Sequence, residues 1–313
     1  MTRVIAFGEA LIDMLARPGD DGQRTFLEQA GGAPANVAVG VAKLGGQACF
    51  MGQVGKDMFG DMLVRTMADY GVDTHALHQT AAGMTALAFV SLDADGERSF
   101  AFYRDGSADL LYRIEHVPDG LFDTPAIFHC CSNTLTDPEI ADTTLALMQQ
   151  ARDAGCLVSF DVNYRHNLWP KTATPADTIA DAMALAHVVK LSREELEALY
   201  GDEQTTVTRL LDDGAQLVLV TDGGNPLNVY WPGGATDIAP VPADMTDSTA
   251  AGDAFVAGLL HRLAEQGITR ETLTGWIANK AQLEKDLQFA CRCGAVAVSR
   301  YGAFDALPTA GDL

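Results

Sequence analysis

Short apolar runs alternate along the chain with segments long enough for a helix and apolar on one side. Continuous apolar runs are typical of buried strands, and apolar residues spaced by three and four are typical of packed helices. We therefore expect strands at 4–7, 48–54, 126–130, 157–161, 188–191 and 216–221. Helices are expected at 35–44, 59–70, 138–154, 175–186, 194–200 and 207–213. This alternation predicts an α/β fold with a mostly parallel central sheet and helices on both faces.

One stretch of the chain breaks the alternation and reads as a β-hairpin. The expected strands are 85–92 and 98–104, joined by the polar connector 93–97, with further extended pieces at 11–17 and 24–27. Together they predict a small second sheet. Such a sheet is typical of a lid over a ligand site, and it could also protect an edge or contact a second subunit. We expect one domain, 1–313, with lid segments at approximately 11–30 and 84–110.

The composition excludes several classes of function. The 313 residues carry a formal net charge of -21, which argues against non-specific binding to nucleic acid or to anionic membranes. No apolar segment has the length of a membrane span, and the N-terminal run reads as a strand rather than a signal peptide. The six cysteines lack the paired spacing of a zinc site, so we expect reduced thiols and a cytoplasmic protein. Neither a P-loop nor a G-x-G-x-x-G motif occurs.

Small residues precede an acid and an apolar helical run late in the chain. Ala250, Ala251 and Gly252 have almost no side chain, so an anion can approach the backbone at the start of the helix. Asp253 follows in the first turn, where a carboxylate could deprotonate an alcohol beside a stabilised phosphoryl group. The alternative is an ordinary acid that stabilises its helix. A helix start also lowers the pKa of a carboxylate, which makes Asp253 a weak base.

A second segment with ligand-binding character lies near the start of the chain. Gly31 and Gly32 open a turn before a helix, and Asn36 lies in the first turn of that helix. The glycines let a ligand approach the backbone, and the amide of Asn36 can both donate to and accept from a hydroxyl group. Taken alone, the segment is also good chemistry for a helix start.

Taken together, the two segments resemble the signatures of the ribokinase-like carbohydrate kinases, also called the PfkB family. Residues 31–60 are similar to the first signature and 247–260 to the second. The stretches FGEALIDML, FDVNYRHNLWP and VSRYGA are most similar to bacterial fructokinases. The resemblance implies a three-layer α/β/α fold with a β-sheet lid and the ATP-dependent conversion of fructose to fructose 6-phosphate. Alternative acceptors are 2-keto-3-deoxygluconate, ribose or a nucleoside, and a non-catalytic sugar- or nucleotide-binding regulator is an alternative of another class.

The resemblance also assigns roles to residues around the sugar. Asp253 is the expected base, and the backbone of Ala250, Ala251 and Gly252 is the expected anion hole. The expected sugar-binding residues are Asp13, Gly31, Gly32, Asn36 and Arg104, with Asn163 and Arg165 contacting phosphate or the far side of the sugar. Arg104 could instead pair only with an acid of the protein, and Arg165 could be a surface ion-pair partner.

For the nucleotide and the metals, the resemblance implies a third group of residues. ATP is expected at Lys190, Ser192, Glu195, Thr221, Gly223, Gly224, Gly252 and Ala290, the last of these near adenine. Glu195 is expected to hold Mg²⁺ through water, although an acid at a helix start is its simpler reading. Potassium is the expected ion at Asp247, Thr249, Ala297 and Gly302. The expected partners are a small sugar and ATP, with no nucleic acid and no membrane, in a homodimer formed through the lid.

Overall fold

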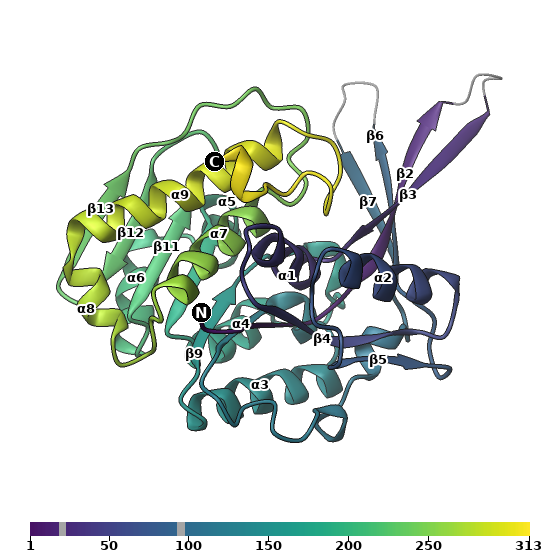
Figure 1. Ribbon diagram of the computed structural model, residues 1–313, viewed down its shortest axis with the longest axis horizontal. Helices are drawn as coiled ribbons and strands as arrows, with labels where there is room; N and C mark the ends of the chain where they lie inside the picture. Colours follow the sequence, from purple (N-terminus) through teal and green to yellow (C-terminus); the bar gives the residue numbers. More distant parts are fainter. Residues whose placement is uncertain (19–22, 93–97) are drawn as a thin grey trace.

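The computed structural model describes residues 1–18, 23–92 and 98–313. In these residues the larger sheet has nine strands in the order β13-β12-β11-β10-β9-β8-β1-β4-β5 (Figure 1). They are β1 (Val4–Phe7), β4 (Ala48–Gly55), β5 (Leu77–Thr80), β8 (Ile127–Cys131), β9 (Leu157–Asp161), β10 (Val188–Ser192), β11 (Leu217–Thr221), β12 (Leu227–Trp231) and β13 (Gly234–Ile238). Only β12 pairs with its neighbours in antiparallel fashion among these strands, so the predicted mostly parallel sheet is confirmed.

The sheet separates two hydrophobic cores because successive strand residues face opposite sides. In β1, Val4 and Ala6 belong to one core, whereas Ile5 and Phe7 belong to the other. The first core is covered by α1 (Ala33–Lys43), α2 (Met58–Asp69), α7 (Ala251–Glu265), α8 (Leu273–Ala278) and α9 (Lys280–Val298). The second is covered by α3 (Pro138–Asp153), α4 (Pro175–Met183), α5 (Arg193–Leu199) and α6 (Glu203–Asp212). The result is the three-layer α/β/α arrangement.

A separate four-stranded sheet projects from this body (Figure 1). Its strands are β2 (Leu11–Pro18), β3 (Arg24–Gly31), β6 (Leu87–Leu92) and β7 (Arg98–Tyr103), in the order β3-β2-β6-β7. The predicted hairpin is therefore present as the antiparallel pair β6–β7, and its connector 93–97 lies outside the described residues. β2 joins it in parallel, which forms the small second sheet expected from the sequence.

Some elements differ from the prediction. Helix α6 begins at Glu203 rather than at 207, because the Asp202 carboxylate accepts a hydrogen bond from the Thr205 N–H at 2.7 Å and caps the helix there. Five short 3₁₀ helices connect larger elements in the described chain: η1 (Ala108–Leu111), η2 (Ile114–His116), η3 (Ser132–Leu135), η4 (His166–Leu168) and η5 (Ala310–Asp312). β5, β12, β13, α8 and α9 were not predicted.

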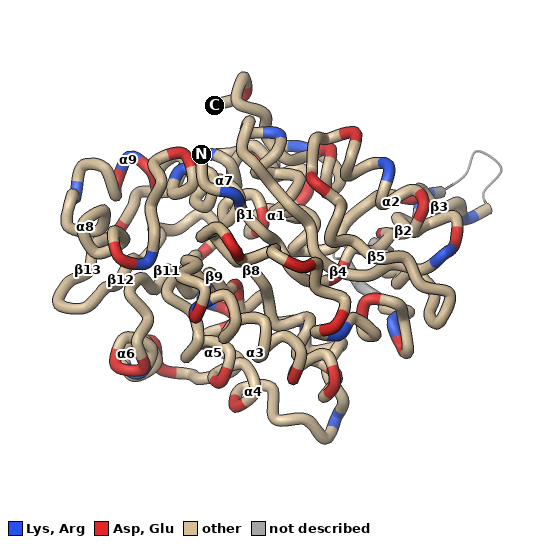
Figure 2. The backbone as a smooth tube through the Cα atoms, turned by 60° about the horizontal axis from the view of Figure 1, so that its bottom comes forward, with Lys and Arg blue, Asp and Glu red and all other residues tan. Residues whose placement is uncertain are grey.

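Charged residues are spread over the backbone rather than gathered by sign. Figure 2 shows Lys and Arg scattered among more numerous Asp and Glu, which agrees with the net charge of -21. The six cysteines form no disulfide. Within the described residues, every helix is too short or too polar to cross a membrane.

Candidate active site

Asp253 lies in the first turn of α7 and is 8% exposed. Its Oδ2 accepts a hydrogen bond from Nδ2 of Asn36 at 2.7 Å, and its Oδ1 accepts from Nδ2 of Asn163 at 3.3 Å. Asn36 belongs to α1, and Asn163 follows β9, so three distant segments meet at one carboxylate. The Oδ1 atoms of both asparagines are buried and have no hydrogen-bond partner among the described residues, which marks a place for a polar ligand.

The pKa of Asp253 is raised to about 6, chiefly because burial disfavours the charged carboxylate. The hydrogen bond from Asn36 lowers this pKa, and the negative charge of Asp161 raises it. The expectation that the helix start would leave Asp253 a weak base is therefore wrong, because desolvation outweighs the helix dipole. With this pKa the group is ionised at neutral pH and more basic than an exposed aspartate, which suits a general base.

The start of α7 exposes backbone N–H groups that no side chain caps. Its N-cap, Ala250, has left-handed backbone angles of φ 58 and ψ 11, which are costly for a residue with a β-carbon. Strained residues of this kind are enriched at functional sites. The N–H groups of Gly252 and Asp253 meet no acceptor in the described part of the chain. A helix start with unpaired N–H groups binds anions.

A buried lysine stands beside this helix start. Nζ of Lys190 lies 3.0 and 3.1 Å from the two carboxylate oxygens of Asp161. A β-carbon placed on Gly252 would lie 3.2 Å from Nζ, so the ammonium group almost touches the turn. Burial alone would lower the pKa of Lys190, but the charges of Asp161 and Glu195 raise it. The anion-binding turn is therefore flanked by a permanent positive charge.

The turn between β3 and α1 is too crowded for side chains. A β-carbon on Gly31 would come within 2.5 Å of Oδ2 of Asp13. One on Gly32, where φ is +109, would come within 2.5 Å of the carbonyl oxygen of Glu9. Glycine at both positions thus lets the carboxylate of Asp13 and the segment after β1 approach the turn.

Arg104 follows β7 but points into the protein and is 5% exposed. Its Nε donates to Asp109 at 2.6 Å, and its Nη1 donates to the carbonyl oxygen of Asn133 at 2.8 Å and to Oγ1 of Thr136 at 3.2 Å. Its Nη2 is buried and meets no hydrogen-bond partner in the part of the chain that the structure describes. Arg104 therefore has a partner acid and also keeps one nitrogen for a ligand.

Ser192 and Thr221 are paired neighbours at the carboxyl ends of β10 and β11. Glu195 accepts from the Ser192 N–H at 2.7 Å, while the Ser192 hydroxyl accepts from the Glu195 N–H at 3.2 Å. This capping box is the helix-start role that the sequence offered as the simpler reading. Glu195 also accepts from the Tyr164 N–H at 2.9 Å, which ties α5 to the segment after β9.

The turn after Thr221 has free space around its two glycines and is fixed by an ion pair through Asp222. Gly223 has a φ of +52, and neither it nor Gly224 has a heavy atom close to the position of an added β-carbon. Asp222 accepts from Nε of Arg193 at 2.9 Å, so an ion pair fixes this turn to the start of α5.

The residues expected around a monovalent cation also come together. Asp247 accepts from the N–H of Thr249 at 2.8 Å and from the N–H of Gly302 at 3.1 Å. The carbonyl oxygen of Ala297 accepts from the Ser299 and Arg300 N–H groups at the end of α9. Carboxylate and carbonyl oxygens are the donors that such hard cations prefer.

Ala290 and Arg165 do not lie where the expected ligand contacts would place them. Ala290 is 0% exposed and packs against Gly258 between α9 and α7, so the structure does not bring its side chain to a surface that adenine can reach. Arg165 is exposed, and in the described residues it forms no ion pair with a carboxylate. Its positive charge nevertheless lowers the pKa of Asp253, so it lies on the same side of the molecule as that carboxylate.

Sequence reasoning missed Glu9, Asn133 and Asp161. All three are buried polar residues at or just beyond the carboxyl ends of β1, β8 and β9. Ligands bind at this edge of an open α/β sheet. An acid at the last residue of an apolar strand, as at Asp161, or two residues beyond it, as at Glu9, was the signal that could have found two of them.

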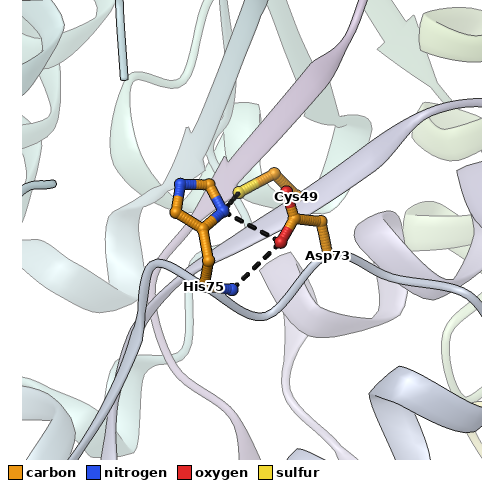
Figure 3. Close-up of side chains that lie close together, drawn as sticks. All are labelled: Cys49, Asp73 and His75. Carbon is orange, nitrogen blue, oxygen red and sulfur yellow. Dashed lines mark hydrogen bonds and ion pairs between the residues drawn. The ribbon is translucent and has the colours of Figure 1, made fainter. Parts of the chain in front are cut away.

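A further polar cluster, formed by Cys49, Asp73 and His75, lies at the amino-terminal end of β4 and is shown in Figure 3. Nδ1 of His75 lies 2.8 Å from Oδ1 of Asp73 and 4.0 Å from Sγ of Cys49. The same Asp73 oxygen accepts from the His75 N–H at 3.0 Å, which is the pattern of a local turn. Burial raises the pKa of the Cys49 thiol to about 12, so we assign this cluster no part in the reaction.

Comparison with known proteins shows similarity to carbohydrate kinases along nearly the whole chain. The model of the pfkB family of carbohydrate kinases matches residues 1–310. A fructokinase of Klebsiella pneumoniae is 39% identical over 314 residues, which cover 99% of this chain and 98% of the relative. The crystal structure of a Xylella fastidiosa fructokinase with bound ATP superposes with a TM-score of 0.94 at 46% identity, covering 99% of this chain and 96% of the other.

A Vibrio cholerae fructokinase crystallised with fructose, ADP and a calcium ion has a TM-score of 0.88 at 35% identity, again with 99% and 96% coverage. An aminoimidazole riboside kinase from Salmonella enterica is 31% identical with a TM-score of 0.85, and 99% and 97% of the two chains are covered. The matches extend over nearly the whole length of each protein. This chain belongs to the pfkB family of carbohydrate kinases.

Proposed function

We propose that this enzyme transfers the γ-phosphoryl group of ATP to O6 of D-fructose and releases fructose 6-phosphate. The observation that carries the proposal is the buried carboxylate of Asp253, held by two amides at the uncapped start of α7. A proton acceptor and an anion-binding turn are thereby combined in one place. The fructokinases among the relatives direct the choice of sugar.

Proton removal falls to Asp253. The hydrogen bonds from Asn36 and Asn163 fix the direction of its carboxylate, so that it accepts the proton of the attacking hydroxyl without reorienting. Phosphoryl transfer passes through a loose transition state that needs little assistance from the base. The pKa of about 6 therefore suffices, and positioning contributes most of the benefit.

Charge on the transferred group is stabilised at the start of α7. We keep the backbone of Ala250, Ala251 and Gly252 as the anion hole, with the ammonium of Lys190 beside it. The Ala251 N–H already donates to the Ser248 carbonyl oxygen at 3.4 Å, so the N–H groups of Gly252 and Asp253, which meet no acceptor in the described residues, make the larger contribution. Donors that are already in place do not have to reorganise during the reaction, which is why such sites stabilise transition states well. Lys190 also pairs with Asp161, so its position is fixed before the nucleotide arrives.

The sugar is held between the lid and the body. We assign its contacts to Asp13, Gly31, Gly32, Asn36, Arg104, Asn163 and Arg165. We assign the four-stranded second sheet the part of a lid over this place, on a single kinase domain, 1–313. For ATP we retain Lys190, Ser192, Glu195, Thr221, Gly223, Gly224 and Gly252, and we give Ala290 only an indirect, packing contribution.

The residues present suit two kinds of metal ion. Both carboxylate oxygens of Glu195 are held by backbone N–H groups, and each retains a lone pair for a water molecule of hydrated Mg²⁺. Bound Mg²⁺ would offset the negative charge of the phosphates. Asp247, Thr249, Ala297 and Gly302 offer oxygen donors to K⁺ close to the anion hole. The free cysteines fit a cytoplasmic location, and the lid is the proposed dimer contact.

A coupled assay of ADP release tests the proposal with fructose, 2-keto-3-deoxygluconate, ribose and a nucleoside as acceptors. We expect kcat/KM for fructose to exceed that for the other acceptors. Asp253→Asn should lower kcat by about 10²–10⁴-fold, because the amide cannot accept the proton. The matched control is Asp244→Asn, an exposed aspartate a few residues before the catalytic turn, which should change kcat little. Near-full activity of Asp253→Asn would refute the assigned role, and sugar binding without turnover of any acceptor would favour a regulator.

A further inference from the structure

Cys49, Asp73 and His75 form the one place in the described residues where three side chains of the metal-binding types come so close together. Their ligand atoms lie within 4.8 Å of one another. Figure 3 shows Nδ1 of His75 facing both the thiol and the carboxylate. The spacing of the cysteines gave no sign of this cluster, because only one cysteine takes part in it. The proposed phosphoryl transfer uses none of the three residues.

The backbone holds these side chains in a fixed register. Cys49 and Asp73 are partners in an isolated parallel bridge. The Asp73 N–H donates to the carbonyl oxygen of Ala48 at 2.9 Å, and the Phe50 N–H donates to the carbonyl oxygen of Asp73 at 3.0 Å. His75 follows two residues later, and its N–H donates to Oδ1 of Asp73 at 3.0 Å. A ligand that binds all three side chains therefore has little ordering to impose on them.

The separations of the three ligand atoms are close to those in a tetrahedral zinc site. Zinc bonds of about 2.3 Å to sulfur and about 2.1 Å to nitrogen and oxygen place sulfur about 3.5 Å from nitrogen, and nitrogen about 3.4 Å from oxygen. Nδ1 of His75 lies 4.0 Å from Sγ of Cys49 and 2.8 Å from Oδ1 of Asp73. Shifts of about half an ångström bring both separations to the values for zinc. The side chains of His75 and Asp73 are exposed, so they have room for such shifts.

The charges around the thiol suit a bound cation. Burial, and after it the charge of Asp73, raises the pKa of the Cys49 thiol to about 12. A divalent ion at the sulfur displaces the thiol proton and neutralises the charge of Asp73. The positive charge of Arg3 lowers the pKa of the thiol and so favours the thiolate form that a metal binds. One thiolate and one carboxylate together match the charge of a divalent ion.

We propose that Cys49, Asp73 and His75 bind one Zn²⁺ ion, with a water molecule in the fourth position. Sulfur, nitrogen and oxygen ligands in one set suit Zn²⁺, whereas Mg²⁺ and K⁺ prefer oxygen alone. His75 binds through Nδ1 and keeps its ring proton on Nε2, and the thiol proton passes to solvent. The ion enters between the exposed side chains of Asp73 and His75, because Cys49 itself is buried.

The ion joins β4 to the segment between α2 and β5. Cys49 lies on β4, whereas Asp73 and His75 come after α2. This is the amino-terminal end of β4, while Asp253 is bonded by Asn163 just beyond the carboxyl end of β9, at the other edge of the sheet. An ion that binds the folded chain more tightly than the unfolded chain stabilises the fold by mass action. The site therefore acts on stability and not on phosphoryl transfer.

Cobalt absorption tests the site, because Co²⁺ can replace Zn²⁺ and a bond between Co²⁺ and a thiolate gives an intense near-ultraviolet band. The full chain, freed of metal with a chelator, is titrated with Co²⁺ in the absence of ATP and sugar. We expect a single equivalent of Co²⁺ to produce the band and added Zn²⁺ to remove it. The sites proposed for Mg²⁺ and K⁺ offer only oxygen atoms and give no such band, so the result does not depend on the proposed kinase activity.

Three variants separate this site from adventitious binding to a thiol. Cys49→Ala should abolish the band. The matched control is Cys291→Ala, which removes the half-buried thiol of α9 and should leave the band intact. Asp73→Asn keeps an oxygen for the His75 N–H, so the turn stays in place. It should nevertheless raise the Kd for Zn²⁺ by about tenfold or more, because even residues that only support metal ligands contribute about 10–100-fold to affinity.

Melting curves without nucleotide give a second readout. The melting temperature of the wild type should rise with the concentration of Zn²⁺, and Asp73→Asn should need about tenfold more Zn²⁺ for the same rise. This comparison decides the question even if Cys49→Ala does not fold. The proposal fails if the wild type gives no band with Co²⁺, if the band survives in Cys49→Ala or disappears in Cys291→Ala, or if Asp73→Asn binds Zn²⁺ as tightly as the wild type.

Discussion

At the scale of single residues, opposing electrostatic effects meet on Asp253. The helix start and the hydrogen bond from Asn36 favour the charged carboxylate, whereas burial and the charge of Asp161 disfavour it. Burial is the largest of these effects, and it leaves the pKa at about 6. The burial of this carboxylate therefore makes it more basic than an exposed aspartate.

The pKa of Asp253 predicts that kcat/KM falls at acidic pH. Because Asp253 must be deprotonated to accept a proton, kcat/KM should be level near neutral pH and fall below about pH 6. The fall should approach tenfold for each unit of pH, since a single proton inactivates the base. A profile of kcat/KM with fructose checks this expectation. A profile that stays level down to about pH 4.5 would contradict it.

Melting curves provide the control for this assignment. The pKa of Asp253 in the folded protein, about 6, lies above its ordinary value of 3.8, so the stability that the protonated group contributes is fully present below pH 3.8 and is lost as the pH rises through 6. The ionised carboxylate thus costs about 3 kcal/mol at neutral pH. Asp253→Asn should gain melting temperature over the wild type at about pH 8, and the gain should vanish near pH 4. If the difference in melting temperature between Asp253→Asn and the wild type is the same at both pH values, the fall in activity at acidic pH belongs to another group, such as the ATP phosphates.

The residues that sequence reasoning missed have a common physical reason. Asp253, Asn36 and the two glycines were found because they occur in helix-start segments with recognisable local chemistry. Asn133 lies in an unremarkable Ser-Asn-Thr segment, and only the folded chain brings its amide to Glu9. The pKa of Asp253 was likewise misjudged, because a linear sequence gives the helix start but not the depth of burial.

At the scale of elements, the hydrogen bond between Asn36 and Asp253 depends on how closely two helices approach. Gly40 in α1 faces α7, and a β-carbon there would come within 2.6 Å of the β-carbon of Ala257. The missing side chain lets α1 lie close to α7, and the same approach brings Asn36 to 2.7 Å from Asp253. The packing of the two helices and the position of Asn36 beside Asp253 are therefore linked through one small residue.

Gly40→Ala tests this link. Overpacking should cost about 1–3 kcal/mol of stability and exceed the gain in helix propensity, and the displaced Asn36 should lower kcat. The matched control is Gly275→Ala in α8, where an added β-carbon meets nothing within 4 Å. That change should stabilise the protein by up to about 1 kcal/mol and leave kcat unchanged. Denaturant unfolding and the coupled assay give both quantities, and equal behaviour of the two variants would disprove the link.

The predicted strands of the larger sheet share one property, which two of its missed strands lack. β1, β4, β8, β9, β10 and β11 are buried on both faces and so appear as apolar runs. β5 is half-buried throughout and β13 is mostly exposed, so neither gives a continuous apolar run. Helix α9 has a polar first half and contains a glycine and two cysteines in its second, which hid its helical pattern.

At the scale of the whole molecule, the site is assembled by the order of the strands. β1, β8, β9, β10 and β11 are consecutive neighbours in the sheet, and each delivers at least one polar residue at or beyond its carboxyl end. The alternation of apolar runs predicts such a sheet but not the order of its strands. Only the resemblance to a known family indicated that distant segments form one site. The order of the strands explains why they meet, because ligands bind at the carboxyl ends of the strands in such sheets.

The lid leaves an apolar surface that a second copy of the chain can cover. Phe26 on β3 and Tyr103 on β7 are 42% and 67% exposed, and the ring of Phe89 on β6 contacts both, at 5.3 and 5.1 Å between centroids. β3 and β7 are also the edges of the lid sheet, where backbone groups are open to pairing. Exposed aromatic residues in a row, beside open strand edges, favour association through this face.

We expect light scattering to give twice the chain mass of 33.2 kDa for the wild type. Charges at Phe26→Glu and Tyr103→Glu would have to be buried without partners in the dimer, so the double variant should have the mass of one chain. Met58→Glu is the matched control, because Met58 is 70% exposed on α2, outside the lid, and its replacement should leave the dimer intact. A single-chain mass for the wild type would rule out the dimer. A dimer in the double variant would move the contact away from the lid, where the body of the molecule would have to provide it.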